Sequence, residues 1–403
     1  MGELLTTRLD GALAARSALL DESHDSAVRL FNGFLEGLPS LVVDLYGKTL
    51  VLFDHSESEK GDEALARQIA THVAGRLPWI TCVVWKVRHS KSAALRSGRF
   101  LLGSAQQLTT KVCEKGVWYA IAPILNHDVG LYLDTRPLRA WATATLAGKR
   151  VLNTFAYTGS LGVAARSAGA KVLNTDLSQR SLALAKESYT LNGWPVDSRD
   201  FRQGDFFEVV GQLKRSGQLF DCVFVDPPFF SVTAKGKVDL QTQSRALLNR
   251  VRPLIADSGA LAFVNNAAFL PGAALLAVLE SLCADGYLSL EHVIAVPEDT
   301  AGYPLTRVGT PPIDPAPFNH STKIVILRVK RKDGFGRGQL PTLTERLRDA
   351  GFTMDTNDEG NTTRQRWKIT NSGFRYRPSS RNGEEERRAK GAWGAGGVWD
   401  SEQ

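Results

Sequence analysis

Apolar residues in the first third of the chain alternate between helical spacing and short β-rich runs. A helical pattern opens the sequence and a second one covers residues 64–73. Tyr46-Gly47-Lys48 has the composition of a tight turn between two β-rich runs. The predicted strands are residues 38–44, 49–54, 80–87 and 117–121. Residues 1–124 are therefore predicted to form a small α+β domain.

From residue 150 the pattern becomes a strict alternation of short β-rich runs and helices, which is typical of a parallel sheet covered on both faces. The predicted strands are residues 151–155, 171–175, 222–225, 260–264, 288–296 and 323–329. The predicted helices include residues 179–191, 241–252 and 273–284. We expect a second domain over residues 125–332, followed by a basic and mostly disordered tail over 333–403, where Arg, Lys, Gly, Ser and Asn dominate.

Composition narrows the class of protein. The 403 residues are 43% hydrophobic and 23% charged, and no run approaches the roughly 18 apolar residues that a membrane span requires. The net charge of +7 fits a polyanionic partner, and equally a solvated basic surface. The four cysteines form no Cys-x-x-Cys pair, so no metal site is expected. They resemble reduced thiols of a cytoplasmic protein, although organellar import stays open.

A glycine turn over residues 153–162 lies where the first strand of the second domain meets a helix. Gly159 has no Cβ, so the backbone there can approach a ligand closely, and free amides at the helix start can bind its polar groups. An ordinary strand-to-helix turn is the alternative.

Acidic residues follow the next two strands. Asp176 ends the second strand, where a carboxylate in this type of sheet accepts hydrogen bonds from both ribose hydroxyls of a nucleoside, although it can also cap the next helix. Asp205 and Phe206 follow the third strand, where a carboxylate can meet the adenine amino group and an aromatic ring can cover the base. Ligands of open α/β sheets bind beyond the carboxyl ends of the strands, so these positions predict one shared site.

The motif Asp226-Pro227-Pro228-Phe229 follows a buried strand and indicates chemistry. The prolines fix the backbone and remove two amide hydrogens, so a carbonyl and the Asp226 carboxylate can face a substrate nitrogen while Phe229 stacks on a planar ring. Methyl transfer is an in-line displacement that depends on holding a nucleophile in line in a water-poor site. A rigid turn at the end of the strand is the alternative.

These motifs, together with residues 130–136, 27–33, 36–39 and 44–47, resemble the bacterial large-subunit ribosomal RNA methyltransferases that include the 5-methylcytosine and N7-methylguanine enzymes. The resemblance runs from about residue 10 to residue 330. It implies a Rossmann-like class I methyltransferase sheet, S-adenosyl-L-methionine as cofactor and RNA as substrate. It also implies that the segment from Tyr132 to Arg136 lines the cofactor site.

The sequence departs from this family in three ways. The cytosine-C5 branch has a nucleophilic cysteine after the fifth strand, where this chain has Asn265 and Asn266. Carbon 5 of cytosine becomes nucleophilic only after a thiolate adds to the ring, so that reaction is rejected, and the paired asparagines resemble the N7-methylguanine branch. The chain also lacks the N-terminal RNA-binding module of many members, and it adds the basic tail. At residues 364–368 and 375–377 the tail combines cationic and aromatic residues, which is typical of segments that bind single-stranded RNA, and a solvated flexible tail is the alternative.

The sequence thus predicts an S-adenosylmethionine-dependent enzyme that methylates a base nitrogen in RNA. The alternatives are a methyltransferase for a small metabolite, a non-catalytic binding module, and a dinucleotide oxidoreductase, which the lack of a Gly-x-Gly-x-x-Gly turn disfavours. The expected catalytic residues are Asp226, Pro227, Pro228 and Phe229. The expected cofactor-binding residues are Tyr132, Asp134, Arg136, Phe155, Tyr157, Thr158, Gly159, Asp176, Leu177, Asp205, Phe206 and Asp226. Phe229, Asn265 and Asn266 are the expected substrate-binding residues.

Overall fold

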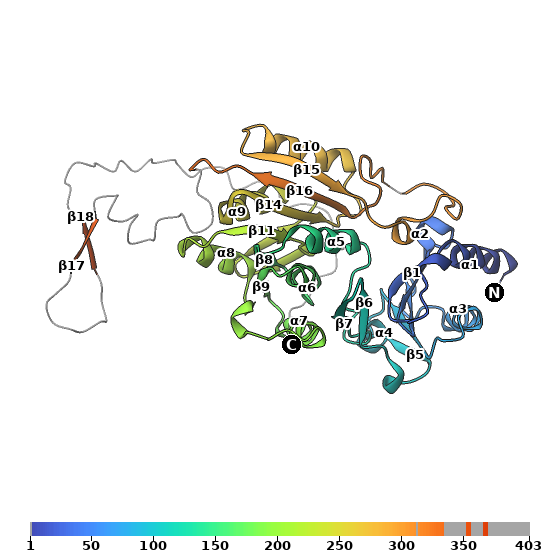
Figure 1. Cartoon of the computed structure of the whole chain (residues 1–403). Coiled ribbons are helices and arrows are strands. Elements are labelled where there is room, and N and C mark those ends of the chain that lie inside the picture. The colour runs from blue at the N-terminus through green and yellow to red at the C-terminus, as the bar shows by residue number, and fades with distance from the viewer. Residues whose placement is uncertain (1, 312, 334–351, 356–365, 370–403) are drawn as a thin grey trace.

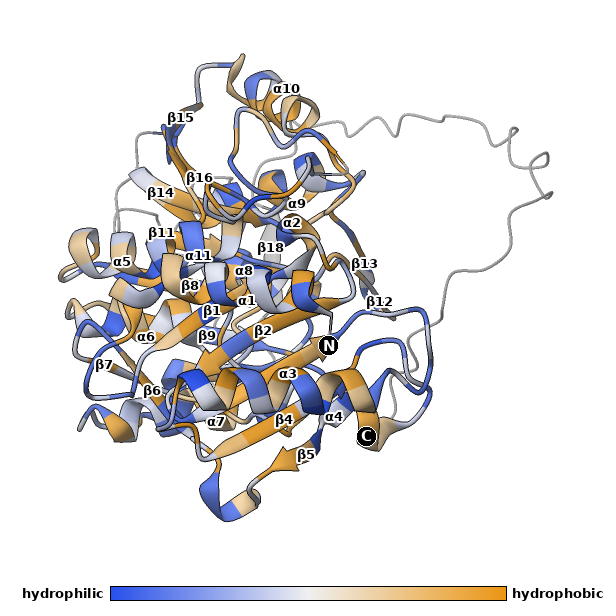
Figure 2. Cartoon of the chain, turned by 90° about the vertical axis from the view of Figure 1, so that its right-hand side faces the viewer, coloured by the Kyte–Doolittle hydropathy of each residue, from blue (hydrophilic) through white to orange (hydrophobic). Residues whose placement is uncertain are grey.

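The computed structural model describes residues 2–311, 313–333, 352–355 and 366–369. Two main sheets form its body: a five-stranded sheet near the N-terminus, at the right of Figure 1, and a seven-stranded sheet at its centre. Figure 2 shows that the strands of both sheets are mostly apolar, while helices such as α3 alternate between apolar and polar positions. Helix α3 therefore turns one face to a sheet and the other to solvent.

The N-terminal sheet has the order β1-β2-β3-β4-β5, with only β3 and β4 parallel. Its strands are β1 (Ala27–Asn32), β2 (Leu41–Tyr46), β3 (Thr49–Asp54), β4 (Cys82–Val87) and β5 (Arg99–Leu102). The helices beside it are α1 (Glu3–Ala15), α2 (Gly33–Glu36), α3 (Glu63–Arg76) and α4 (Ala93–Ser97). Residues such as Leu9 of α1 and Ile69 of α3 bury one face of the sheet.

The opposite face of this sheet packs against the rest of the molecule. Val42 and Phe53 share a buried cluster with Leu131 and with Tyr189 of the second half. The β6–β7 ladder, made by Lys111–Glu114 and Val117–Ala120, belongs to the same cluster. Both faces of β2 and β3 are thus buried, which explains their continuous apolar runs.

The seven-stranded sheet has the order β10-β9-β8-β11-β14-β16-β15. Its strands are β8 (Arg150–Thr154), β9 (Lys171–Asp176), β10 (Phe201–Gln203), β11 (Phe220–Val225), β14 (Ile255–Asn265), β15 (Leu288–Ile294) and β16 (Lys323–Val329). The helices of this half are α5 (Arg136–Thr145), α6 (Ser160–Ser167), α7 (Gln179–Leu191), α8 (Phe206–Arg215), α9 (Ser244–Val251), α10 (Gly272–Cys283) and α11 (Glu298–Ala301). Separate apolar cores on its two faces contain α8, α9 and α10 on one side and α5 and α6 on the other.

The predicted Rossmann-like α/β fold is confirmed, with one correction to the sheet. β16 runs antiparallel to both β14 and β15, whereas the alternation predicted an all-parallel sheet. A parallel neighbour needs a long crossover that is usually helical, and the segment between β15 and β16 holds only the four-residue α11. Three predicted elements, β3, α7 and β16, have the predicted bounds.

The short antiparallel ladders were largely missed. The β12–β13 hairpin (Phe230–Thr233 and Gly236–Asp239) follows the Asp-Pro-Pro motif directly. Within the expected tail, β17 (Phe352–Asp355) pairs with β18 (Arg366–Ile369). The rest of the expected disorder, with residues 364–365 and 375–377, lies outside the described residues, and the domain limits at 124 and 332 stay a prediction.

In the described part of the chain, no helix is long and apolar enough to cross a bilayer. Among the same residues, no group of three or more His, Cys, Asp or Glu side chains is arranged to hold a metal ion.

Candidate active site

The carboxyl ends of β8, β9, β10, β11 and β14 surround a cavity of about 850 Å³. Its size is within the range of about 300–1,000 Å³ that is usual for small-molecule sites, and its position is where open α/β sheets bind ligands. The predicted residues in its wall are Tyr132, Asp134, Phe155, Tyr157, Asp176, Leu177, Asp205, Phe206, Asp226, Pro227, Pro228 and Asn266. The other predicted residues, which are not part of this wall, are Arg136, Thr158, Gly159, Phe229 and Asn265.

The glycine turn after β8 shapes the cavity through its aromatic residues. Phe155 and Tyr157 line the cavity and have φ angles of 51° and 49°, in the left-handed region that costs energy for residues with a Cβ. Gly159 has a φ of 77° and begins α6, but it is not part of the wall. A Cβ there would lie 2.6 Å from the Cβ of Ala185 on α7, so close helix packing requires this glycine. The approach of its backbone to a ligand stays a prediction.

Thr158 anchors the same turn from behind. Its hydroxyl is buried and donates a hydrogen bond to the carbonyl of Gly130. Thr158 therefore ties the turn to the segment that leads into Tyr132, and its side chain does not reach the cavity.

Asp176 is held firmly at the end of β9. One carboxylate oxygen accepts a hydrogen bond from the Tyr157 amide at 2.7 Å, and the other accepts one from the Ser178 amide at 2.8 Å. Burial raises the pKa of Asp176, and these amide donors act against the rise. Each carboxylate oxygen has a second lone pair, so the group can still accept hydrogen bonds from a vicinal diol.

Asp205 and the aromatic residues beside it form a second ligand-facing wall. Asp205 is the N-cap of α8 and accepts hydrogen bonds from the amides of Phe207 and Glu208. The rings of Phe155 and Phe206 stack with their centroids 4.4 Å apart. This combination of an acceptor and flat apolar surface suits a nucleobase.

Asp226 lies at the end of β11, in the most unusual electrostatic setting of the cavity. Burial, reinforced by the negative charge of Asp134, raises its pKa to about 7, while Arg139 opposes the rise. The carbonyl of Pro227 accepts a hydrogen bond from the Asn266 side chain at 3.5 Å, which links the ends of β11 and β14. A buried carboxyl that titrates near neutrality, in a cavity, is typical of a functional group.

Phe229 and Asn265 do not contribute to this wall. Phe229 is 43% exposed and is not part of the cavity lining, which includes the next residue, Phe230. Asn265 is fully buried: its side-chain amide donates to the Leu240 carbonyl and the Ser244 hydroxyl, and its oxygen accepts from the Ala267 amide. Its hydrogen bonds are thus used inside the fold.

The segment from Tyr132 to Arg136 divides between two roles. Tyr132 and Asp134 line the cavity, and Asp134 accepts a hydrogen bond from the Thr322 hydroxyl at 2.7 Å. Arg136 instead forms an ion pair with buried Asp299, with both guanidinium nitrogens within 3.1 Å of its carboxylate. This pair places Arg136 in the contact with the N-terminal sheet and not in the cavity.

The β12–β13 hairpin forms a side of the cavity that the sequence reading missed. Phe230, Val232 and Val238 line the cavity from this hairpin. The sequence does contain the pattern of a hairpin here, because runs of alternating apolar and polar residues flank Ala234-Lys235-Gly236, which has the composition of a turn.

None of the four cysteines lines the cavity. Cys222 is buried within β11, where burial raises the pKa of its thiol. Cys82, Cys113 and Cys283 lie on β4, β6 and α10. No thiolate is therefore positioned for addition to a substrate ring.

Comparison with known proteins agrees with this geometry. The family model of the S-adenosylmethionine-dependent methyltransferases matches residues 49–298. The chain is 30% identical over 235 residues to the ribosomal RNA large subunit methyltransferase I of Shewanella denitrificans, and 32% identical over 231 residues to that of Aeromonas hydrophila. These matches cover 57% and 56% of this chain and 58% and 57% of the relatives. The chain thus spans less than two thirds of the relatives' length.

Solved structures show the same fold. A putative methyltransferase complexed with SAH has a TM-score of 0.67 and a putative SAM-dependent methyltransferase from Streptococcus mutans one of 0.66, each with 20% identity and 80% coverage of both chains. The cavity at the strand ends has the size, the acceptor groups and the aromatic surface that a nucleoside-bearing cofactor requires. With more than half of its length matched by the family model, the chain belongs to the S-adenosylmethionine-dependent methyltransferases.

Proposed function

We propose that this protein methylates a nitrogen atom of a base in RNA, ribosomal RNA in particular, in the cytoplasm. The observation that carries the proposal is the position of Asp226-Pro227-Pro228 in the wall of the strand-end cavity, at the opposite side of β8 from Asp176. This arrangement leaves room for a cofactor nucleoside near Asp176 and an acceptor near Asp226.

The cofactor side is assigned to residues of β8, β9 and β10. S-adenosyl-L-methionine supplies an electrophilic methyl group on a sulfonium. Asp176 accepts hydrogen bonds from the ribose hydroxyls, and Asp205 accepts one from the adenine amino group. Phe155 and Phe206 cover the base, while Leu177, which is 58% exposed, closes the outer side.

The acceptor side is assigned to Asp226 and its neighbours. The ionised Asp226 carboxylate and a proline carbonyl orient the nucleophilic nitrogen, so that its lone pair faces the methyl group. A ring nitrogen already has this lone pair and needs no covalent catalyst, in agreement with a cavity wall that contains no cysteine. Asn266, which donates to the Pro227 carbonyl, positions this turn.

RNA is favoured over a small metabolite by three observations. The relatives are named ribosomal RNA methyltransferases, and the net charge of +7 suits a polyanion. The hairpin beside the cavity also exposes Phe229, Phe230 and Val232, with the Lys237 ammonium 5.0 Å from the centre of the Phe230 ring. Exposed aromatic rings next to cations are common in surfaces that bind single-stranded RNA.

The test is transfer of labelled methyl groups to ribosomal RNA and, in parallel, to a small-molecule extract. Nuclease digestion and mass spectrometry would identify the methylated base. We expect an N-methylated base in RNA, at least 100-fold less product with Asp226→Ala, and cofactor affinity within about threefold of wild type. A 5-methylpyrimidine product, or label in the small-molecule fraction alone, would refute the proposal.

A further inference from the structure

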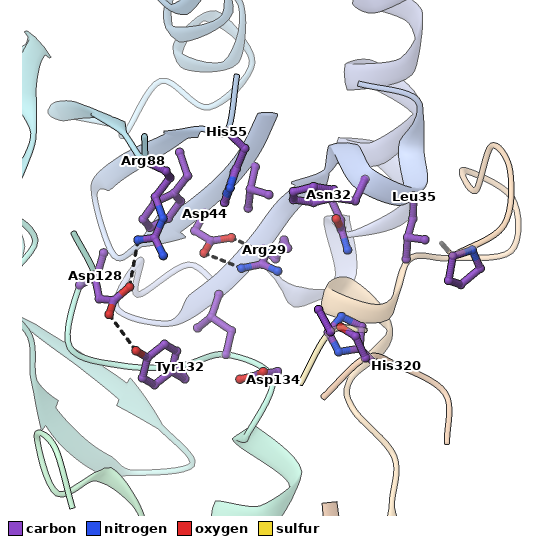
Figure 3. Close-up of a pocket in the computed structure, with 18 of the residues that line it drawn as sticks. Arg29, Asn32, Leu35, Asp44, His55, Arg88, Asp128, Tyr132, Asp134 and His320 are labelled. Carbon is purple, nitrogen blue, oxygen red and sulfur yellow. Dashed lines mark hydrogen bonds and ion pairs between the residues drawn. The ribbon is translucent and has the colours of Figure 1, made fainter. Parts of the chain in front are cut away.

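A second cavity, of about 400 Å³, lies between the N-terminal sheet and the seven-stranded sheet. Figure 3 shows Arg29, Asn32, Asp44 and His55 on the wall formed by the N-terminal sheet, opposite Tyr132, Asp134 and His320. Tyr132 and Asp134 line this cavity and the strand-end cavity alike. The two cavities are therefore neighbours with one shared wall, and the charge of Asp134 on this wall helps to raise the pKa of Asp226.

Two arginines of the second cavity are paired with carboxylates. Arg29 forms a bidentate pair with Asp44, with nitrogen–oxygen distances of 2.7 and 3.1 Å. Arg88 pairs with Asp128 at 3.0 Å, and the Tyr132 hydroxyl donates to the same carboxylate at 2.8 Å. The two dashed networks of Figure 3 are these pairs. A phosphate would have to compete with the carboxylates, so the cavity is poorly suited to a free phosphate group.

The remaining wall is mostly apolar and has two further charged side chains, those of Arg307 and Asp134. Phe53, Val129, Leu133 and Phe269 are among its apolar residues. Burial lowers the pKa of His320 to about 4, which leaves its imidazole neutral at physiological pH. Flat apolar surface with a few recessed polar groups is the usual lining for a planar heterocycle.

A β-bulge in β1 turns two polar residues toward this cavity. Arg29 pairs with Asp44 and Phe31 with Val43, so the register shifts between them. In a regular strand Arg29 and Asn32 would face opposite sides, because side chains alternate. The bulge lets both line the cavity, and bulges of this kind re-aim side chains at functional sites.

Asn32 is left with an unused acceptor. Its side chain is 3% exposed, and its amide nitrogen donates to the Thr300 carbonyl at 2.6 Å. Its side-chain oxygen is buried and has no hydrogen-bond partner. A buried acceptor without a partner has lost its hydrogen bonds to water, and an N–H donor from a ligand would replace one of them.

We propose that the second cavity receives the target base of the RNA, flipped out of its stack, with N–H groups of the base donating to Asn32 and Asp134. The atom to be methylated is directed past Tyr132 and Asp134, which line both cavities, toward the strand-end cavity that Asp226 lines. This assignment rests on the proposed function. Guanine is the base that offers the most N–H donors on one edge. Enzymes that act on a base extrude it into such a pocket at a cost of a few kcal/mol, which contacts in the pocket offset.

The assignment is tested by binding of guanosine monophosphate in the presence of saturating S-adenosylhomocysteine, which occupies the cofactor site. Asn32→Leu removes the acceptor at nearly constant volume, and Asn32→Ala removes it without adding bulk. The matched control is Asn192→Leu, since the Asn192 amide donates to the Trp118 and Ser188 carbonyls outside both cavities. Affinity for S-adenosylhomocysteine checks that each variant is folded.

We expect wild type and Asn192→Leu to bind guanosine monophosphate equally, and both Asn32 variants to bind it at least tenfold more weakly. RNA methylation by the folded Asn32 variants should fall at least tenfold under single-turnover conditions. Equal nucleotide binding by wild type and the folded Asn32 variants, or no binding by any of them, would overturn the cavity assignment.

The two proposals fail in different ways. If wild type methylates RNA and the Asn32 variants match it in rate and nucleotide binding, only the cavity assignment fails. If wild type methylates no RNA but loses nucleotide binding on Asn32 substitution, the RNA function fails and the base pocket stands.

Discussion

The carboxyl group of Asp226 shows how a single residue can oppose stability and support function. Its pKa is about 7 in the folded protein, mainly because it is buried, against 3.8 for the free side chain. A raised pKa means that the folded state binds the proton more tightly than the unfolded state. The stabilisation from this proton is full below about pH 4 and is lost as the pH rises through 7.

Asp226→Asn should therefore stabilise the protein at pH 8 by about 1–3 kcal/mol, and leave stability nearly unchanged at pH 4. The same substitution should abolish methyl transfer, because the amide cannot replace the carboxylate in orienting the acceptor. Urea unfolding at both pH values measures the first effect. Equal stability of the two proteins at pH 8 would mean that Asp226 is not held in an unfavourable environment.

Asp176 provides the corresponding test on the cofactor side. Asp176→Ala removes a charged acceptor and leaves the Tyr157 and Ser178 amides without their present partner. Cofactor affinity should fall by about 10- to 100-fold, since hydrogen bonds to charged groups contribute about 1.5–3 kcal/mol. Calorimetric titration with S-adenosylhomocysteine measures this loss. Asp205→Ala, at the adenine end, should show a smaller loss, and unchanged affinity for Asp176→Ala would remove this residue from the proposed site.

At the residue scale, the sequence predicted which strand ends carry the site but not which side chains face it. Asp176, Asp205 and Asp226 were found because position at a strand end is visible in the hydrophobic pattern. Phe229 and Asn265 were misplaced, since one residue along a strand end reverses the direction of a side chain. No local pattern marks that reversal.

At the scale of elements, the contact between α6 and α7 sets the shape of the glycine turn. Gly159→Ala should destabilise the protein by about 1–3 kcal/mol, because a Cβ would lie 2.6 Å from Ala185 and the φ angle of 77° disfavours any side chain. Ala185→Gly in the same chain should recover the part that comes from the clash and leave the part that comes from φ. Thermal unfolding of both single variants and the double variant separates the two terms. Additive losses would show that the residues do not touch.

The order of elements was easier to predict than their directions and pairings. Alternating helices and strands identify the doubly covered sheet, and long periodic elements such as α7 were placed to the residue. The reversal of β16 depends on what connects it to β15, and Val238 of the β12–β13 hairpin packs into the core of the second half. Both are tertiary effects, which local periodicity does not encode.

At the scale of the whole molecule, the base pocket is made by residues that are far apart in sequence, such as Arg29 and His320. The sequence predicted an N-terminal domain beside a methyltransferase domain, but not that the second face of its sheet would be buried against the other half. That contact creates the second cavity. If the RNA base enters this second cavity, the N-terminal sheet contacts the substrate and has a substrate-handling role.

Asp299, at α11, connects the two halves and provides a test of their coupling. Its side chain is 1% exposed, pairs with Arg136 at the start of α5 and accepts a hydrogen bond from the Arg29 amide of β1, and its carbonyl accepts one from Arg16. Asp299→Asn removes one partner of a buried ion pair, which should cost about 3 kcal/mol. Because these contacts hold β1 against the methyltransferase half, RNA methylation should fall more steeply than cofactor affinity. The control is Glu291→Gln, which breaks a surface pair with Arg328 and should cost less than about 1 kcal/mol. If the folded Asp299→Asn variant methylates RNA at the wild-type rate, the placement of the N-terminal sheet does not matter for catalysis, and the acceptor must approach the strand ends by another route.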